Sequence, residues 1–190
     1  IYGLPHQTPA SFAKTLDVLG RVDGCFANAG VGGRAPSFLE MTGEEWHRVL
    51  RVNLDGVFYT FKAAARHMVK RGDGGALVGT ASLAAISGQA RGQHYAATKG
   101  GVISMIRAMA VEFARYQIRA NAILPGWIET DMTAKTFANE RFREKVLPRV
   151  PMRRWGESSD FGGIAVYLMS EASRYHSGDT FLIDGAYSIF

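Results

Sequence analysis

Two side chains suited to acid–base chemistry share the segment Tyr95-Ala96-Ala97-Thr98-Lys99. The pattern predicts a helix over 94–115, and residues four apart on a helix lie one turn apart on the same face. A phenol titrates near pH ~10, and a neighbouring ammonium favours the phenolate, so we expect Lys99 to lower the pKa of Tyr95. Tyr95 could then exchange a proton with a substrate hydroxyl. Such a pair also arises by chance, so it needs partners before it indicates a site.

Ser82 and Asn53 are candidate partners of this pair. Ser82 follows an expected strand, and ligands of open parallel sheets bind beyond the carboxyl ends of strands. A hydroxyl there could polarise the carbonyl oxygen that Tyr95 protonates. Asn53 lies where two helical patterns meet, and its amide could hold a water that links Lys99 to solvent. Alone, each side chain is equally compatible with a plain backbone contact in a loop or cap.

Apolar strand-like runs alternate with helical patterns along the chain, which predicts an α/β fold. Expected strands cover 22–27, 76–79, 118–124 and 180–183. Expected helices cover 8–19, 42–51, 55–70, 94–115, 132–150 and 160–170, and Thr42 with Glu45 forms a capping box. We therefore expect one domain over 1–190 with a Rossmann-like, doubly wound parallel sheet and helices on both faces.

Composition excludes several classes of protein. No apolar run is long enough to span a bilayer. The net charge of +5 comes from scattered residues, so we do not expect nucleic acid as a partner. The one cysteine, Cys25, lies in an apolar run and is expected to be a buried hydrophobe in a reducing, cytoplasmic compartment. The five histidines show no metal-ligand spacing, so no metal is expected.

The order and spacing of several motifs resemble the short-chain dehydrogenase/reductase family from about residue 15 onward. These motifs are Asn28-Ala29-Gly30, Asn53, Ser82, Tyr95, Lys99, Pro125-Gly126-Trp127-Ile128-Glu129-Thr130 and Ile183-Asp184-Gly185-Ala186. The resemblance implies an oxidoreductase that uses NAD or NADP and moves a hydride between the nicotinamide and the carbon of a small alcohol or ketone.

The resemblance also implies a role for each matched residue. Tyr95 would be the catalytic acid/base, Lys99 would lower its pKa and bind the nicotinamide ribose, Ser82 would orient the substrate oxygen, and Asn53 would sustain a proton relay. The remaining matches would bind the cofactor. Asn28, Ala29 and Gly30 would line the side of the adenosine ribose, Pro125 and Gly126 would border the cofactor, and Ile128 and Thr130 would contact the nicotinamide amide. Ala27 stands where the family usually has a first asparagine.

The front of the chain departs from the family pattern. Members begin with a strand, a glycine-rich turn and a further strand pair, and this first βαβ part, with its pyrophosphate-binding loop, is missing from the sequence. We expect that the protein is longer; the alternative is a truncated form that binds dinucleotide poorly. The residue that distinguishes NAD from NADP would lie in that part, so the preference is not readable.

By resemblance, the stretch 127–155 forms a lid over the substrate. It carries basic side chains that could steer an anionic substrate, or could form an ordinary solvated face together with Glu140 and Glu144. The basic residues are Lys135, Arg141, Arg143, Lys145, Arg149, Arg153 and Arg154. The expected pocket walls are Leu83, Ala84, Gln89, Gln93, His94, Trp127 and Trp155, with His94 turned away from Tyr95.

Several readings of function stay open. The enzyme could resemble a 3-oxoacyl-carrier-protein reductase or a sugar or polyol dehydrogenase. The alternative is a non-catalytic or truncated protein that keeps this fold and binds a ligand. A sugar-nucleotide epimerase or dehydratase shares the Tyr-x-x-x-Lys pair, but usually has a much larger C-terminal region. The resemblance further implies a homotetramer or homodimer that assembles through the helices expected at 56–70 and 94–115.

Overall fold

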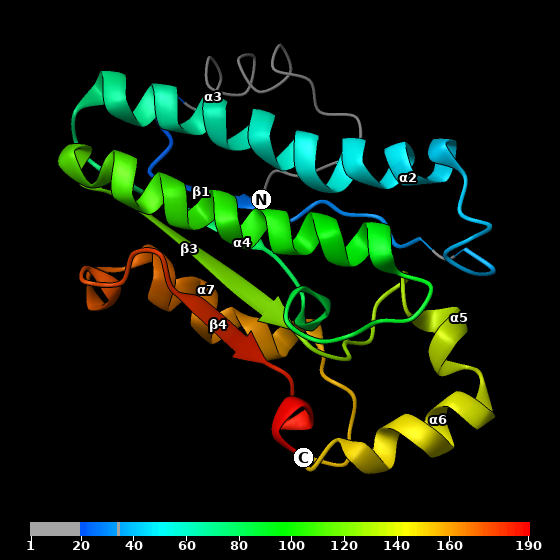
Figure 1. Ribbon diagram of the computed structural model, residues 1–190. Helices are drawn as coiled ribbons and strands as arrows, with labels where there is room; N and C mark the ends of the chain where they lie inside the picture. Colours follow the sequence, from blue (N-terminus) through cyan, green and yellow to red (C-terminus); the bar gives the residue numbers. More distant parts are fainter. Residues whose placement is uncertain (1–19, 34) are drawn as a thin grey trace.

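A single parallel sheet organises the protein. The computed structural model describes residues 20–33 and 35–190, so the helix expected at 8–19 lies outside the described residues (Figure 1). The strands stand in the order β1-β2-β3-β4, and all three pairings are parallel. They are β1 (Gly24–Ala27), β2 (Gly75–Thr80), β3 (Ile118–Pro125) and β4 (Thr180–Ile183). The four predicted strands are confirmed, and their carboxyl ends meet at one edge of the sheet.

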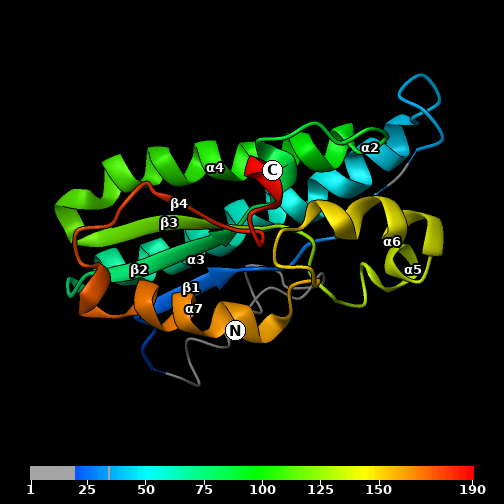
Figure 2. The same cartoon turned by 90° about the horizontal axis from the view of Figure 1, so that it is seen from below.

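Helices cover both faces of this sheet, as predicted for a doubly wound fold. The long helices α3 (Gly56–Arg71) and α4 (Gln93–Phe113) lie across one face, and α7 (Gly162–Met169) lies against the other (Figure 2). A 3-10 turn, Ser158–Phe161, precedes α7 and replaces the start of the helix expected at 160–170. No helix in the described part of the chain is long and apolar enough to cross a bilayer.

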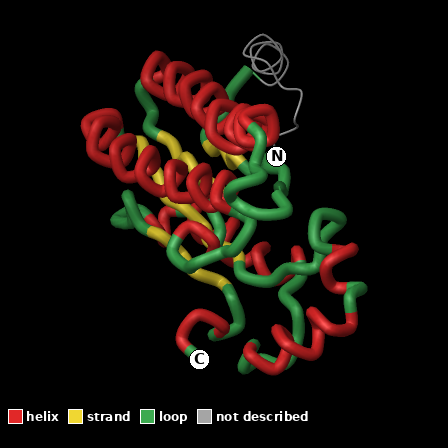
Figure 3. The backbone as a smooth tube through the Cα atoms, turned by 45° about the vertical axis from the view of Figure 1, so that its right-hand side comes forward, coloured by secondary structure: helices red, strands yellow, loops and turns green. Residues whose placement is uncertain are grey.

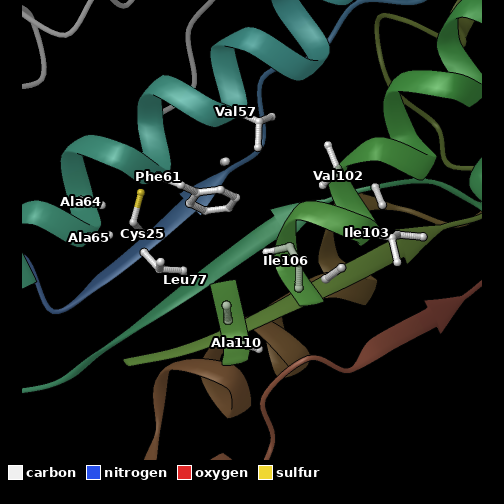
Figure 4. Packing of buried hydrophobic residues seen from close by; sticks show 14 of the residues in the cluster. Cys25, Val57, Phe61, Ala64, Ala65, Leu77, Val102, Ile103, Ile106 and Ala110 are labelled. Carbon is white, nitrogen blue, oxygen red and sulfur yellow. The ribbon is translucent and has the colours of Figure 1, made fainter. Parts of the chain in front are cut away.

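The main core lies between the sheet and the pair α3 and α4. Phe61 of α3, Leu77 of β2 and Ile106 of α4 are all fully buried within it (Figure 4). Cys25 of β1 belongs to the same cluster and is only 4% exposed. Burial raises the pKa of its thiol to about 11, because the thiolate would lose its hydration. The expectation that Cys25 is a buried hydrophobe is therefore confirmed.

The helix α2 (Gly43–Leu50) begins where the sequence predicts it. Thr42 is its N-cap, and the Thr42 hydroxyl accepts a hydrogen bond from the Glu45 amide at 3.1 Å. The chain does not break between this helix and the next. It passes through a π-helical turn, Arg51–Asp55, directly into α3. The junction expected at Asn53 is thus a π turn, a feature often found at functional sites.

The lid segment differs from its prediction. The single helix expected over 132–150 is wrong: the structure has α5 (Ala134–Phe137), α6 (Glu140–Val146) and a 3-10 turn, Leu147–Arg149. Asn139 separates the two helices, because its side chain accepts a hydrogen bond from the Phe142 amide at 3.0 Å and starts a new helix. Pro148, which has no amide hydrogen, lies in the 3-10 turn. Figure 3 shows short helical pieces joined by loops beside the sheet.

Candidate active site

Ser82 and Tyr95 line one cavity of about 820 Å³. It lies past the ends of β2 and β3, on the side toward which the strands point and where α5 and α6 lie (Figure 1). The lid supplies Met132, Lys135 and Phe142 to its wall. The cavity thus lies beyond the carboxyl ends of parallel strands, where the sequence analysis expects a site. That the segment 127–155 covers a substrate there stays a prediction.

Ser82 reaches the cavity because β2 ends just before it. It caps a 3-10 turn, Leu83–Ala85, and its hydroxyl oxygen accepts a hydrogen bond from the Ala84 amide at 3.1 Å. This contact uses a lone pair and leaves the hydroxyl proton available to donate. The Ser82 hydroxyl also lies near the phenol of Tyr95, where its effect is to lower the pKa of that phenol. A carbonyl oxygen between these two groups would meet two donors.

The pKa of Tyr95 moves in the direction opposite to the prediction. Burial raises the pKa above its usual value because the phenolate would be poorly hydrated, and the Ser82 hydroxyl partly offsets that rise. The Lys99 ammonium nitrogen lies 5.6 Å from the centre of the Tyr95 ring. At that distance its charge does not outweigh burial, so the expected lowering is wrong. Tyr95 keeps its proton at neutral pH.

Lys99 is almost completely buried, at 3% exposure. Its ammonium nitrogen donates to the Thr80 carbonyl oxygen at 2.7 Å, and burial lowers its pKa to about 8. An ammonium has three donors, and within the described residues Thr80 is its one hydrogen-bond acceptor. Two N–H groups are therefore available to a ligand with adjacent hydroxyl groups, such as a ribose.

Asn53 is fully buried in the π turn and bonded to the loop that follows β1. Its amide oxygen accepts from the Val31 amide at 2.8 Å, and its amide nitrogen donates to the Val31 carbonyl at 2.9 Å. The same nitrogen lies 3.4 Å from the Thr98 hydroxyl. This side chain holds the loop against α4. Its expected role in a proton relay stays a prediction, because Val31 already occupies both amide groups.

The segment Asn28-Ala29-Gly30 lies at the carboxyl end of β1, beside Lys99. The Thr80 hydroxyl donates to the Asn28 amide oxygen at 2.8 Å. A Cβ added at Gly30 would lie 3.4 Å from both the Lys99 nitrogen and the Asn53 amide oxygen. Thr80 therefore joins this segment to Lys99, a function that sequence reasoning missed because a threonine at a strand end carries no distinctive pattern.

The segment 125–130 leaves β3 in a constrained path. The Gly126 amide donates to the Ile183 carbonyl at 2.9 Å, and Ile128 forms a bridge with Gly156. The Thr130 hydroxyl lies 3.2 Å from that of Thr133. Gly126 borders the cavity, whereas the residues that line it do not include Ile128 or Thr130. Pro125 ends the strand itself. The cofactor contacts expected of this segment stay predictions.

The expected pocket walls are partly confirmed. Leu83, Ala84, Gln89 and Trp127 line the cavity. The expectation is wrong for Gln93, His94 and Trp155, which do not line it. Trp155 stacks on the Phe137 ring at 4.2 Å between ring centres. His94 is fully buried with its Nε2 atom 3.3 Å from a Glu45 carboxylate oxygen, so it is turned away from the reacting groups as predicted.

Two charged lining residues, Glu45 and Arg48, were missed. They come from α2, which packs against α4 although more than forty residues separate the two in sequence. The Glu45–Arg48 spacing resembles any surface ion pair on a helix. No signal in the sequence distinguishes it from a solvated pair, so only the packing of α2 identifies these residues as part of the cavity.

Comparison with known proteins places this geometry in a family. A family model described as enoyl-(acyl carrier protein) reductase matches residues 5–188. L-rhamnose 1-dehydrogenase (NAD(P)(+)) of Azotobacter vinelandii is 38% identical over 175 residues, which are 91% of this chain and 67% of the relative. The 2-dehydro-3-deoxy-D-gluconate 5-dehydrogenase of Escherichia coli is 36% identical over 179 residues, 94% of this chain and 70% of the relative.

A solved structure agrees closely with the fold. The gluconate 5-dehydrogenase of Burkholderia cenocepacia, crystallised with NADP and tartrate, superposes with a TM-score of 0.92 at 33% identity. The match covers 99% of this chain and 73% of that one. The fold and site define a Rossmann-like oxidoreductase. More particularly, the chain belongs to the short-chain dehydrogenase/reductase family. The relatives named above are dehydrogenases of this family that act on CH–OH groups.

Proposed function

We propose that this NAD(P)-dependent oxidoreductase uses Tyr95 as its acid/base and Ser82 as the group that orients the substrate oxygen. One observation carries the proposal: Ser82 and Tyr95 line a single cavity, and the Ser82 hydroxyl is close enough to the phenol to act on its pKa. An alcohol or ketone oxygen bound between the two hydroxyl groups meets both at once. The cofactor, when bound, supplies or accepts the hydride at the neighbouring carbon.

The electrostatics of Tyr95 suit proton donation to a carbonyl oxygen. Its raised pKa keeps the phenol protonated at neutral pH, so a proton is in place when negative charge develops on the substrate oxygen. Ser82 donates its hydroxyl hydrogen to the same oxygen and stabilises that charge. In the direction of oxidation, Tyr95 must first lose its proton, so oxidation should require a higher pH than reduction.

The residues around Lys99 fit a nicotinamide nucleotide. Two ammonium donors of Lys99 remain for ribose hydroxyls, and Gly30 adds no side chain near them. We assign Asn28, Ala29 and Gly30 to the adenosine side, and Pro125, Gly126, Ile128 and Thr130 to the nicotinamide side. NAD and NADP are both compatible with these contacts. Lys99 would pass the proton of Tyr95 toward solvent, and Asn53 would support this relay by holding the loop after β1 in place beside Lys99.

The polar atoms of the cavity favour a substrate with several hydroxyl groups. Hydroxyl and amide side chains line it beside Ser82, namely Ser87, Gln89, Thr136 and Asn139. Such groups can pair with the hydroxyl groups of a ligand, whereas a plain hydrocarbon chain would take water from them and give no partner in return. This supports a sugar or polyol rather than a long acyl substrate.

We further propose a homotetramer, or at least a homodimer, located in the cytoplasm. Phe58 and Tyr59 of α3 and Val111 of α4 are large apolar side chains that remain exposed on the two long helices. Burial of such side chains against a second copy would stabilise an assembly. A buried free thiol at Cys25 is compatible with a reducing compartment.

Replacement of Tyr95 by phenylalanine tests the acid/base assignment. The change removes one oxygen, so the fold should persist while kcat for ketone reduction falls about 10²–10⁴-fold. Absorbance of NADH or NADPH with a panel of ketones gives the rate, and Tyr175→Phe at a fully exposed site is the matched control. Turnover by Tyr95→Phe at the rate of the control would refute the assignment.

A further inference from the structure

The basic side chains of the lid do not share one environment. Arg154 bonds to Asp160 at 2.7 Å, Arg153 donates to the Pro148 carbonyl, and Arg149 lies over the Tyr187 ring. Arg153 and Arg154 are occupied outside the cavity, and Arg149 contacts the lining residue Tyr187 without lining the cavity itself. Of the seven basic residues counted on the lid, Lys135 is the one that lines the cavity shared by Ser82 and Tyr95. The lid as a whole is therefore not a cationic surface over the substrate.

A second cation, on α2, lines the same cavity. Arg48 of α2 donates from Nε to Glu45 at 2.6 Å, and from Nη2 to Glu45 and to the Gly32 carbonyl, both at 2.9 Å. These contacts use both Nη2 hydrogens and fix the plane of the guanidinium. Nη1, with two donors, has no acceptor within the described residues. A donor group held in place before binding loses little entropy on binding a ligand.

The charged residues that line the cavity sum to a positive charge. Arg48 and Lys135 each add one positive charge, and Glu45 adds one negative charge. The bond to Arg48, with a smaller contribution from His94, lowers the pKa of Glu45 to about 2, so this carboxylate stays ionised and serves the positioning of Arg48. One uncompensated positive charge therefore remains for a ligand.

We propose that the substrate carries a carboxylate, bound by Arg48 and Lys135, while its hydroxyl or ketone carbon lies at Ser82 and Tyr95. The substrate class is then a small hydroxy acid or keto acid such as a sugar acid. This rests on the oxidoreductase function proposed above. A carboxylate, with a charge of −1, matches the surplus, whereas a phosphate carries about −1.5 to −2 at pH 7 and would be undercompensated.

Paired ligands that differ in one group test this assignment. D-gluconate and D-glucitol differ in a carboxylate against a hydroxymethyl group, and 3-hydroxybutyrate and 2-butanol form a second pair. Trp127 lines the cavity, so quenching of tryptophan fluorescence reports binding without turnover. We expect the acid of at least one pair to bind the full chain about tenfold or more tightly than its neutral partner. Equal binding within both pairs, or no binding of any of the four, overturns the proposal.

Variants identify the cations responsible. Arg48→Gln and Lys135→Gln should each weaken binding of the acid about tenfold and leave the neutral partner unchanged. Lys145→Gln, on the same lid but away from the cavity, is the control and should change neither. Lys135 is exposed, so its variant folds even if the loss of Arg48 disturbs α2. Acid binding unaffected in Lys135→Gln and in a folded Arg48→Gln overturns the assignment, and so does tighter binding of D-glucitol 6-phosphate than of D-gluconate.

Turnover separates this inference from the function on which it rests. If the acids bind and depend on Arg48 but no acid or alcohol is oxidised with NAD or NADP, the proposed function fails and the carboxylate site stands. If neutral alcohols are oxidised with kcat/KM equal to or above that of the acids, the function stands and the carboxylate site fails. If acids are oxidised with the higher kcat/KM, and Lys135→Gln removes that advantage, both are supported.

Discussion

The residue type of Lys99 does not set its pKa, which depends on how deeply the fold buries the side chain. Burial lowers its pKa to about 8, whereas an unfolded lysine titrates near ~10.4. Below pH 8 the ammonium is charged in both states, so the folded protein bears the full cost of burying it. As the pH rises from 8 toward 10.4, the folded state loses the proton first and that cost is relieved.

We therefore expect the wild type to gain stability relative to Lys99→Met as the pH rises. Between pH 7 and pH 10 the difference in the free energy of unfolding should move by about 2.5 kcal/mol in favour of the wild type. Urea denaturation at both values measures it, and the comparison with the variant cancels the titration of other groups. Identical pH dependence in the two proteins would show that Lys99 is not desolvated in the folded state.

At this scale the sequence predicts which residues carry chemistry but not how they titrate. Tyr95 and Ser82 were predicted from type and position, and the structure brings both to one cavity. The direction of the Tyr95 pKa could not be predicted, because it depends on burial by segments far away in sequence. Arg48 and Glu45 were missed for the same reason, since only the packing of α2 on α4 turns them toward the site.

At the scale of elements, the turn after β3 depends on the absence of one side chain. A Cβ at Gly126 would lie 2.5 Å from the Cβ and 2.7 Å from the Cα of Asp184. The obstacle includes backbone, which cannot rotate away as a flexible side chain could. Gly126 also donates to Ile183 of β4, so displacement of this turn would disturb both the strand end and the edge of the cavity.

Gly126→Ala should therefore destabilise the protein by about 1–3 kcal/mol through overpacking and lower kcat/KM as well. Gly163→Ala is the matched control: it adds the same methyl group on α7, where nothing lies within 4 Å. In a helix that change should leave stability unchanged or raise it slightly. Thermal unfolding of both variants gives the comparison. Equal midpoints would mean that the turn at Gly126 accepts a side chain by moving.

The bounds of a helix or strand could be predicted where the apolar pattern sets them. They could not be predicted where a capping side chain sets them. The strand expected at 180–183 is β4 without change, because its boundaries coincide with turn residues. The helix expected over 132–150 is two short helices, because Asn139 binds the Phe142 amide and begins a new one. The charged residues in that stretch have high helix propensity, but propensity does not show where one helix ends and the next begins.

At the scale of the molecule, the alternation of strands and helices was enough to predict a parallel sheet covered on both faces. Parallel strands need crossover connections, and helices supply them. What the pattern could not show is which outward surfaces are left apolar after the helices have packed. The core uses one face of α3, with Phe61 fully buried, while Phe58 and Tyr59 on the same helix stay exposed. An amphipathic pattern would have left polar residues there.

Because these side chains are exposed, the proposed assembly of several copies can be tested by its native mass. The native mass from light scattering should be four times the 20.7 kDa of one chain, or twice it for a dimer. Phe58→Glu places a charge on a surface that is 42% exposed in one chain and would be buried between copies, so it should lower the native mass. Leu39→Glu, at a loop position that is 94% exposed, is the control and should leave the mass unchanged. A wild type that scatters as a single chain would exclude the assembly. A Phe58→Glu variant with the wild-type mass would exclude α3 as the contact, because an interface does not tolerate a buried carboxylate without a partner.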